Sequence, residues 1–238
     1  MIYVVGIGPG DRLCRTAAAD AALAQADVLV GYRTYIDLVR EEFADKPTFE
    51  TAMLGEVERC REAVRLSREG KRVAVVCSGD AAVYGMASLI LELTGPEDEV
   101  EVVPGVTAAL TASALLGAPL AGDMAIVSLS DLLTPWDVIE KRLDAAARGD
   151  FCMAIYNPAS KKRADYLRRA VDIILRWQPD DVMCGWVRNI GREGQETRIM
   201  TLSELADAQV DMFTTVIIGN RSTVLKDGRL VTPRGYRK

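Results

Sequence analysis

The sequence predicts an α/β fold made of two α/β domains. Short apolar runs, typical of buried strands, alternate along the 238 residues with longer segments of helical periodicity. Three apolar runs in the first half end in glycine-containing loops, as strands do at the ligand-binding edge of an open sheet. Residues 117–122 hold two glycines and a proline between periodic segments. We therefore place the domain boundary there, with domains at 1–117 and 122–238.

The first half reads as alternating strands and helices. Strands are expected at 2–5, 27–30, 72–76 and 99–103. Helices are expected at 14–25, 34–43, 56–69, 86–93 and 105–116. The alanine-rich composition of the first helix favours helical structure, and Gly70 is suited to end the helix at 56–69. In that third helix we expect Val57, Cys60, Val64 and Leu66 to face inward.

The second half repeats this rhythm. Strands are expected at 125–129, 151–156, 182–187, 197–200 and 214–218, and a hairpin at 224–231. Helices are expected up to residue 148, at 161–176 and at 202–208. Thr134 is suited to cap the first of these helices, with Pro135 at its first position, and Ser160 to cap the second.

Composition excludes several classes of function. The net charge of −5 argues against general nucleic-acid binding, which requires a basic surface. The chain has no histidine, and its five cysteines show no metal-ligand spacing, so we expect no metal site. Without histidine, Ser/His and Cys/His catalysis are also excluded, and the catalytic residue stays unknown. We find no leader and no membrane-spanning apolar run, and therefore expect a cytoplasmic protein with reduced thiols and no membrane association.

The three glycine loops can converge on one pocket, since each follows a strand. They are residues 6–11, 77–86 and 104–108. Gly79 allows the backbone to approach a ligand closely, and Asp80 can accept hydrogen bonds there. The first loop is a poor match to a dinucleotide-binding fingerprint. Pro9 interrupts the glycine spacing, and no acidic residue ends the second strand.

The ordered set of motifs resembles the tetrapyrrole methylase family over essentially the whole chain. The first-half motifs are GIGPGD at 6–11, SGD at 78–80 and PGVTA at 104–108. Three second-half motifs resemble the branch that methylates precorrin-3B at C17. They are SLSDLLTPW at 128–136, YNPASKKR at 156–163 and VRNIGREG at 187–194.

The resemblance implies an S-adenosylmethionine-dependent C-methyltransferase of cobalamin biosynthesis, associated with contraction of the corrin ring. It would act on C17 of precorrin-3B or its cobalt analogue, as a homodimer with the cofactor in a cleft between the domains. The expected cofactor-binding residues are Pro9, Gly79, Asp80, Val83, Tyr84, Thr107, Ala108, Tyr156, Asn157, Val187, Arg188 and Thr214. The substrate is a polycarboxylate tetrapyrrole, for which guanidinium groups are suited partners. The expected substrate-binding residues are Asp11, Ser130, Lys161, Arg188 and Arg192.

Two alternatives stay open. The chain could be another tetrapyrrole methylase, acting at a different corrin carbon or on uroporphyrinogen III. It could also be a non-catalytic homologue that binds S-adenosylmethionine. The second alternative is considered because this sequence differs from the C17-methylating branch at one position. Gly122 stands where members of that branch often carry a histidine.

Overall fold

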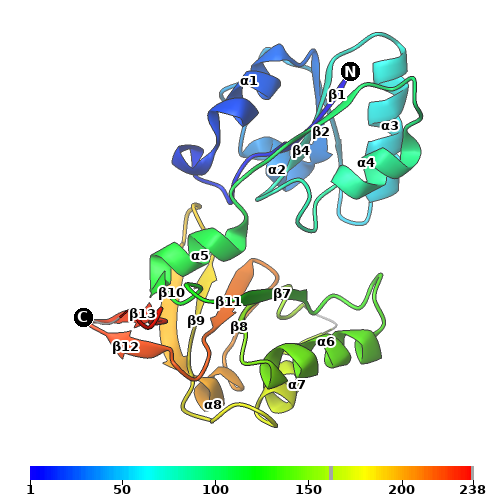
Figure 1. The fold of residues 1–238 in the computed structure, drawn as a ribbon. Helices are drawn as coiled ribbons and strands as arrows, with labels where there is room; N and C mark the ends of the chain where they lie inside the picture. Colours follow the sequence, from blue (N-terminus) through cyan, green and yellow to red (C-terminus); the bar gives the residue numbers. More distant parts are fainter. Residues whose placement is uncertain (161–162, 237–238) are drawn as a thin grey trace. The chain divides into compact units, whose positions relative to one another are not determined.

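The computed structural model describes residues 1–160 and 163–236, which form two compact units, Met1–Ala108 and Ala109–Lys238 (Figure 1). The two units divide after Ala108, whereas we expected the boundary at residues 117–122. Gly117 and Ala118 form strand β6 (Gly117–Ala118), which pairs with β13 (Arg229–Val231). A Cβ on Gly117 would lie 2.4 Å from the carbonyl oxygen of Leu230. Glycine is therefore required at position 117 for the close approach of β6 and β13, and it does not mark a linker.

The first unit is built on a five-stranded parallel sheet. Its strands, in the order β3-β2-β4-β1-β5, are β3 (Thr48–Thr51), β2 (Val28–Tyr32), β4 (Val73–Cys77), β1 (Ile2–Gly6) and β5 (Val100–Val103). All neighbouring pairs are parallel. The edge strand β3 is missing from the sequence-based prediction, because its sequence, TFET, has no continuous apolar run.

Helices cover both faces of this sheet. The described elements are η1 (Arg12–Cys14), α1 (Ala17–Gln25), α2 (Arg33–Asp37), α3 (Glu56–Arg68) and α4 (Ala87–Leu93). Alternate residues of the strands pack against α1 and α2 on one face and against α3 and α4 on the other. Each buried strand therefore contributes to two hydrophobic cores, which explains its continuous apolar run.

Three helix predictions in this unit need correction. The first helix begins at Ala17 because the side chain of Thr16 accepts a hydrogen bond from the Ala19 N–H. The second helix ends at Asp37, well before residue 43. In α3, Cys60 and Val64 are buried as expected, but Val57 is 46% exposed.

The second unit contains a mixed sheet. Its order is β10-β9-β11-β8-β7, from β10 (Glu196–Thr201), β9 (Met183–Arg188), β11 (Thr214–Ile218), β8 (Cys152–Tyr156) and β7 (Met124–Ser128). Only β7 and β8 pair in parallel, and the other neighbours are antiparallel. The expected hairpin is β12 (Val224–Lys226) with β13. The α/β class is therefore confirmed, while the second sheet departs from a purely parallel arrangement.

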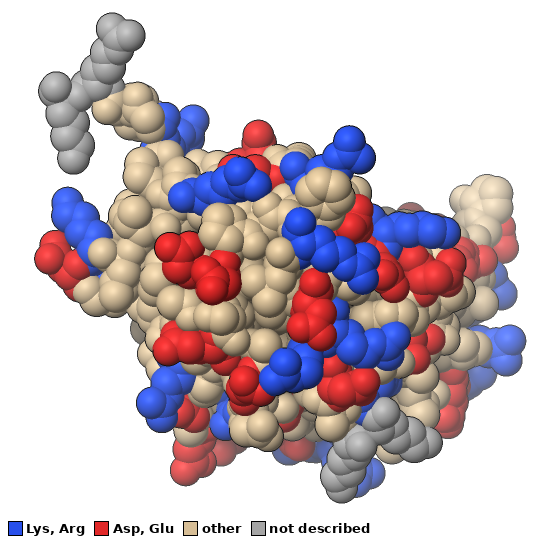
Figure 2. Space-filling view, turned by 90° about the horizontal axis from the view of Figure 1, so that it is seen from below, with Lys and Arg blue, Asp and Glu red and all other residues tan. Residues whose placement is uncertain are grey.

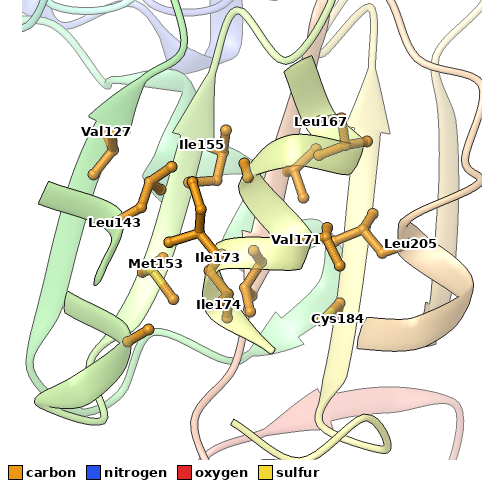
Figure 3. Packing of buried hydrophobic residues seen from close by; sticks show 14 of the residues in the cluster. Val127, Leu143, Met153, Ile155, Leu167, Val171, Ile173, Ile174, Cys184 and Leu205 are labelled. Atoms are coloured by element: carbon orange, nitrogen blue, oxygen red, sulfur yellow. The ribbon is translucent and has the colours of Figure 1, made fainter. Parts of the chain in front are cut away.

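The main core of the second unit lies between this sheet and helices α6 (Trp136–Arg148), α7 (Tyr166–Ile174) and α8 (Leu202–Leu205). Figure 3 shows Ile173 and Ile174 of α7 beside Met153 and Ile155 of β8, and Val171 on the side of Cys184 and Leu205. Helix α5 (Ala108–Leu116) extends Leu116 toward Gly185 of β9, where a Cβ would lie 2.9 Å from a Leu116 methyl.

Two caps in this unit differ from the expected ones. Pro135, not Thr134, is the N-cap of α6, because its backbone is extended and its carbonyl accepts from Val138. Helix α7 begins at Tyr166 with Asp165 as N-cap, so Ser160 does not cap it. The Arg163 N–H instead donates to the carbonyl of Ser160.

The surface carries both charge signs. Figure 2 shows lysine and arginine side chains interspersed with aspartate and glutamate over the face in view, without one extended basic area. Among the described residues, no helix is long and apolar enough to cross a membrane.

Acid should destabilise the first unit through Asp98. Hydrogen bonds from Arg68 and from the Gly95 N–H lower the pKa of Asp98 to about 2. A carboxyl with a lowered folded-state pKa stabilises the fold above its unfolded pKa, and this stabilisation is lost as the pH falls toward 2. We expect Asp98→Asn to be less stable than wild type at pH 6 and to lose less stability on acidification. Urea denaturation at a series of pH values measures this, and parallel pH profiles would contradict it.

Candidate functional site

The three glycine loops lie together at one edge of the first sheet. They follow β1, β4 and β5, which are adjacent parallel strands in register, so their carboxyl ends share an edge. This juxtaposition confirms the spatial convergence expected from the sequence. It is also the edge at which open α/β sheets bind ligands.

The first two loops are joined by backbone hydrogen bonds. The Gly8 N–H donates to the Gly79 carbonyl at 3.0 Å, and the Gly79 N–H donates to the Gly8 carbonyl at 2.7 Å. Both glycines have positive φ, +74° and +70°, which disfavours any residue with a Cβ. The pair fixes the relative positions of the loops after β1 and β4.

The third loop approaches the first two at Gly105. A Cβ on Gly105 would lie 2.1 Å from the Gly79 carbonyl oxygen and 2.6 Å from that of Gly6. A Cβ on Gly6 would in turn lie 2.7 Å from the Gly105 nitrogen. These neighbours are backbone atoms, which cannot rotate away as a side chain can. The three loops therefore pack this closely only with glycine at both positions.

Asp80 connects the second loop with the third. Its Oδ1 accepts from the N–H groups of Ala82 and Val83 at 2.8 and 3.1 Å, and its Oδ2 accepts from the Gly105 N–H at 2.9 Å. We expected this carboxylate to accept a hydrogen bond from the ligand. Both carboxylate oxygens already accept hydrogen bonds from the loop backbone, so in the structure Asp80 positions the backbone around the candidate site.

The other expected cofactor-binding residues of the first unit lie in the same three loops. Tyr84 has a left-handed backbone, with φ +56°, and a side chain 55% exposed. A non-glycine residue in that conformation is strained, and such strain occurs often at ligand sites. Pro9 and Thr107 are buried, whereas Val83 and Ala108 are partly exposed. Loops with small residues and one exposed aromatic ring suit an uncharged, partly apolar ligand group such as an adenosyl moiety.

In the second unit, Tyr156 and Asn157 end strand β8. The Tyr156 hydroxyl accepts from the Ala109 N–H at 2.8 Å and so anchors the beginning of α5. Asn157 has φ +52°, and its amide donates to the Ser128 hydroxyl at 2.9 Å. Ser128 ends β7, the parallel neighbour of β8, so both residues lie at one edge of the sheet.

A polar network continues from this edge into the loop after β7. The Arg163 guanidinium donates to the Ser130 hydroxyl at 3.0 Å and lies 3.4 Å from Asp131. The Tyr166 hydroxyl donates to Asp131 at 2.6 Å. This hydrogen bond, aided by the positive charge of Arg163, holds the pKa of Asp131 below its ordinary value. The same hydrogen bond raises the pKa of Tyr166. Asp131 and Tyr166 were absent from the expected site, although Asp131 lies within the 128–136 motif.

The expected cofactor residues Arg188 and Thr214 make contacts within the second unit. They face each other across β9 and β11, and both contact Asp211. The Arg188 guanidinium lies 3.3 Å from Asp211, 3.5 Å from Glu196, and donates to the Gln209 carbonyl at 2.7 Å. Thr214 is buried and donates to Asp211 at 2.9 Å. Val187, fully buried, points to the other face of the strand.

Arg188→Leu should therefore reduce stability as well as any ligand binding. The change removes the donors that hold residues 209–214 to the sheet, and we expect a loss of about 1–2 kcal/mol in unfolding free energy. Arg198→Leu is the matched control, because Glu196 is the one ion-pair partner of Arg198 among the described residues and the Arg198 side chain is 63% exposed. Its loss of unfolding free energy should therefore be near zero. Urea denaturation compares the two. An Arg188→Leu protein with unchanged stability and weaker tetrapyrrole binding would support the substrate-binding role that the sequence predicts for Arg188.

The remaining expected substrate residues are spread over both units. The Asp11 carboxylate accepts from the Leu13 N–H and caps η1. Ser130 belongs to the network above, and Arg192 donates its N–H to the Asn189 carbonyl in the turn after β9. Lys161 lies outside the described residues. These assignments stay predictions, as does the expected cleft between two domains.

Clusters of metal-ligating side chains and reactive thiols were sought among the described residues. No group of three or more metal-ligating side chains is found in residues 1–160 and 163–236. All five cysteines are free, and burial raises the pKa of Cys60 to about 11 and of Cys77 to about 12. Those two thiols are protonated near neutral pH and are poor nucleophiles.

Comparisons with known proteins agree on one family. The family model described as Tetrapyrrole (Corrin/Porphyrin) Methylases matches residues 1–206. The probable cobalt-factor III C(17)-methyltransferase of Salmonella typhimurium is 45% identical to this chain, over 99% of each sequence. Some other relatives are longer, and the chain spans 52% and 45% of two of them.

Solved structures give the same result. The methyltransferase CobJ has a TM-score of 0.90 and 36% identity, over 98% of this chain and 99% of its own. A uroporphyrin-III C-methyl transferase from Thermus thermophilus, complexed with S-adenyl homocysteine, has a TM-score of 0.72 and 25% identity, over 92% of this chain and 96% of its own.

Proposed function

Because the chain belongs to the tetrapyrrole (corrin/porphyrin) methylase family, we propose that it is an S-adenosylmethionine-dependent methyltransferase that methylates C17 of cobalt-factor III or precorrin-3B. One observation carries the choice of substrate: 45% identity to a probable cobalt-factor III C(17)-methyltransferase over 99% of both sequences. The reaction is associated with corrin ring contraction in cobalamin biosynthesis.

The three-loop cluster of the first unit is the proposed cofactor site. S-adenosylmethionine supplies an activated methyl group, so the protein has mainly to bind and orient it beside the acceptor carbon. The Gly8–Gly79 pair and the Asp80 hydrogen bonds hold the loop backbones in fixed positions. Such preorganisation lowers the entropy cost of binding.

Two measurements test the proposal. Isothermal titration with S-adenosylhomocysteine tests cofactor binding, and a protein that does not bind it would contradict the proposal. Incubation with S-adenosylmethionine and either cobalt-factor III or precorrin-3B, followed by mass spectrometry, tests the reaction. We expect a mass gain of one methylene unit, with the new methyl group on C17. Turnover of uroporphyrinogen III alone would favour another branch of the family.

The proposal includes a cytoplasmic homodimer. Five free cysteines, four of them buried, suit a reducing compartment. The dimer rests on the resemblance to the family. Sedimentation at micromolar concentration tests it, and a monomer would contradict it.

A further inference from the structure

Residues 129–135, which we term the leucine loop, expose two neighbouring leucines in the second unit. Leu132 is 60% exposed and Leu133 is 97% exposed, whereas Leu129 at the start of the loop is fully buried. Adjacent leucines exposed to this degree leave a large apolar area in water. Such areas, rimmed by polar groups, often mark a binding surface.

The leucine loop is attached to its surroundings through its first three residues. The Leu129 N–H donates to the Tyr156 carbonyl at 2.9 Å, and the Ser130 N–H donates to the Ser128 hydroxyl at 3.2 Å. In the middle, Asp131 is held by Tyr166 and Arg163. The exposure of the two leucines is therefore imposed by hydrogen bonds on the residues just before them.

Cationic and aromatic groups lie beside the leucine loop. The Arg163 guanidinium contacts Ser130 and Asp131, and that of Arg169 lies 4.0 Å from the ring centre of Trp136 and 4.9 Å from that of Tyr166. The Trp136 and Tyr166 rings are themselves 4.5 Å apart. Stacking on aromatic rings leaves the edge of a guanidinium able to donate to a carboxylate. The surface thus combines exposed apolar side chains with the Arg163–Asp131 ion pair and with the guanidinium of Arg169.

We propose that the leucine loop binds the tetrapyrrole substrate, with Leu132 and Leu133 against the apolar face of the macrocycle and Arg163 and Arg169 toward its carboxylates. The inference rests on the proposed function for the identity of this ligand. A flat apolar ring with carboxylates at its rim matches both properties of the surface. The loop also leaves the carboxyl end of β7, beside Asn157 at the end of β8. It would act by positioning the substrate.

The double variant Leu132→Ser/Leu133→Ser tests this. We expect the KM for cobalt-factor III, and its dissociation constant in an absorbance titration, to rise roughly ten- to hundredfold, as for loss of a buried leucine contact. The affinity for S-adenosylhomocysteine and the thermal midpoint should not change, because both leucines are exposed in the free protein. Leu132→Met/Leu133→Met should restore tight binding. Leu225→Ser, which alters a leucine 53% exposed in β12, is the matched control and should resemble wild type.

The outcomes separate this inference from the proposed function. If wild type binds and methylates the tetrapyrrole and the double variant does so with an unchanged KM, the leucine loop is not a substrate contact. If the double variant also sediments as a monomer where wild type is a dimer, the two leucines belong to a contact between copies, which equally overturns the inference. Failure of wild type to bind S-adenosylhomocysteine or tetrapyrrole would instead overturn the proposed function.

Discussion

Gly105→Ala is expected to weaken S-adenosylhomocysteine binding roughly hundredfold, the size of effect that follows a displacement of about 1 Å in a binding site. The new methyl carbon would lie 2.1 Å from the Gly79 carbonyl oxygen, so the loops after β4 and β5 must separate. That separation also strains the Asp80–Gly105 hydrogen bond. Overpacking of this kind costs about 1–3 kcal/mol, and we expect the unfolding free energy to fall by that amount. Isothermal titration and urea denaturation measure the two effects.

Gly122→Ala is the matched control for this substitution. Among the described residues, a Cβ there would meet only the Thr232 methyl, at 4.0 Å, and the backbone of Gly122 is not left-handed. We expect wild-type binding and unchanged or slightly increased stability. If Gly105→Ala binds S-adenosylhomocysteine as tightly as Gly122→Ala does, the three loops do not form the cofactor site.

Asp80→Ala should weaken S-adenosylhomocysteine binding about ten- to hundredfold. The substitution removes the acceptor for three N–H groups, those of Ala82, Val83 and Gly105. Each unmet hydrogen bond costs about 1–3 kcal/mol where water does not replace it, and 1.4 kcal/mol corresponds to about tenfold in affinity. This loss of affinity arises because the loops become disordered. Slower association of S-adenosylhomocysteine and a lower thermal midpoint of unfolding should therefore accompany it.

Asp80→Asn distinguishes the two possible roles of this side chain. Asparagine keeps one accepting oxygen, so it can still cap Ala82 and Val83 while losing the link to Gly105. A loop-positioning role predicts an affinity between those of wild type and Asp80→Ala. Equal losses in both variants at unchanged stability would indicate direct contact with the ligand, as first expected. Wild-type affinity in Asp80→Ala would show that the loop is not part of the cofactor site.

The sequence by itself determined the α/β class, most strands, the three glycine loops and the family. These depend on local properties. A strand buried on both faces must be apolar throughout, and a backbone with positive φ at Gly8 and Gly79 favours glycine. Each of these structural features therefore restricts the residue type at single positions of the sequence. The order of the motifs along the chain then sufficed for the resemblance, which the family match and the 45% identical relative confirm.

Only the tertiary structure decided which side chains are already engaged. Asp80 and Arg188 looked available for ligands, but Asp80 binds a backbone N–H 25 residues away and Arg188 binds a carbonyl 21 residues away. The pairing of β6 with β13 likewise joins segments distant in sequence, and the pattern of Gly117–Ala118 resembles a linker. Such partners depend on how remote segments pack, and a hydrogen-bonding side chain has the same sequence signature whether its partner is a ligand or its own backbone.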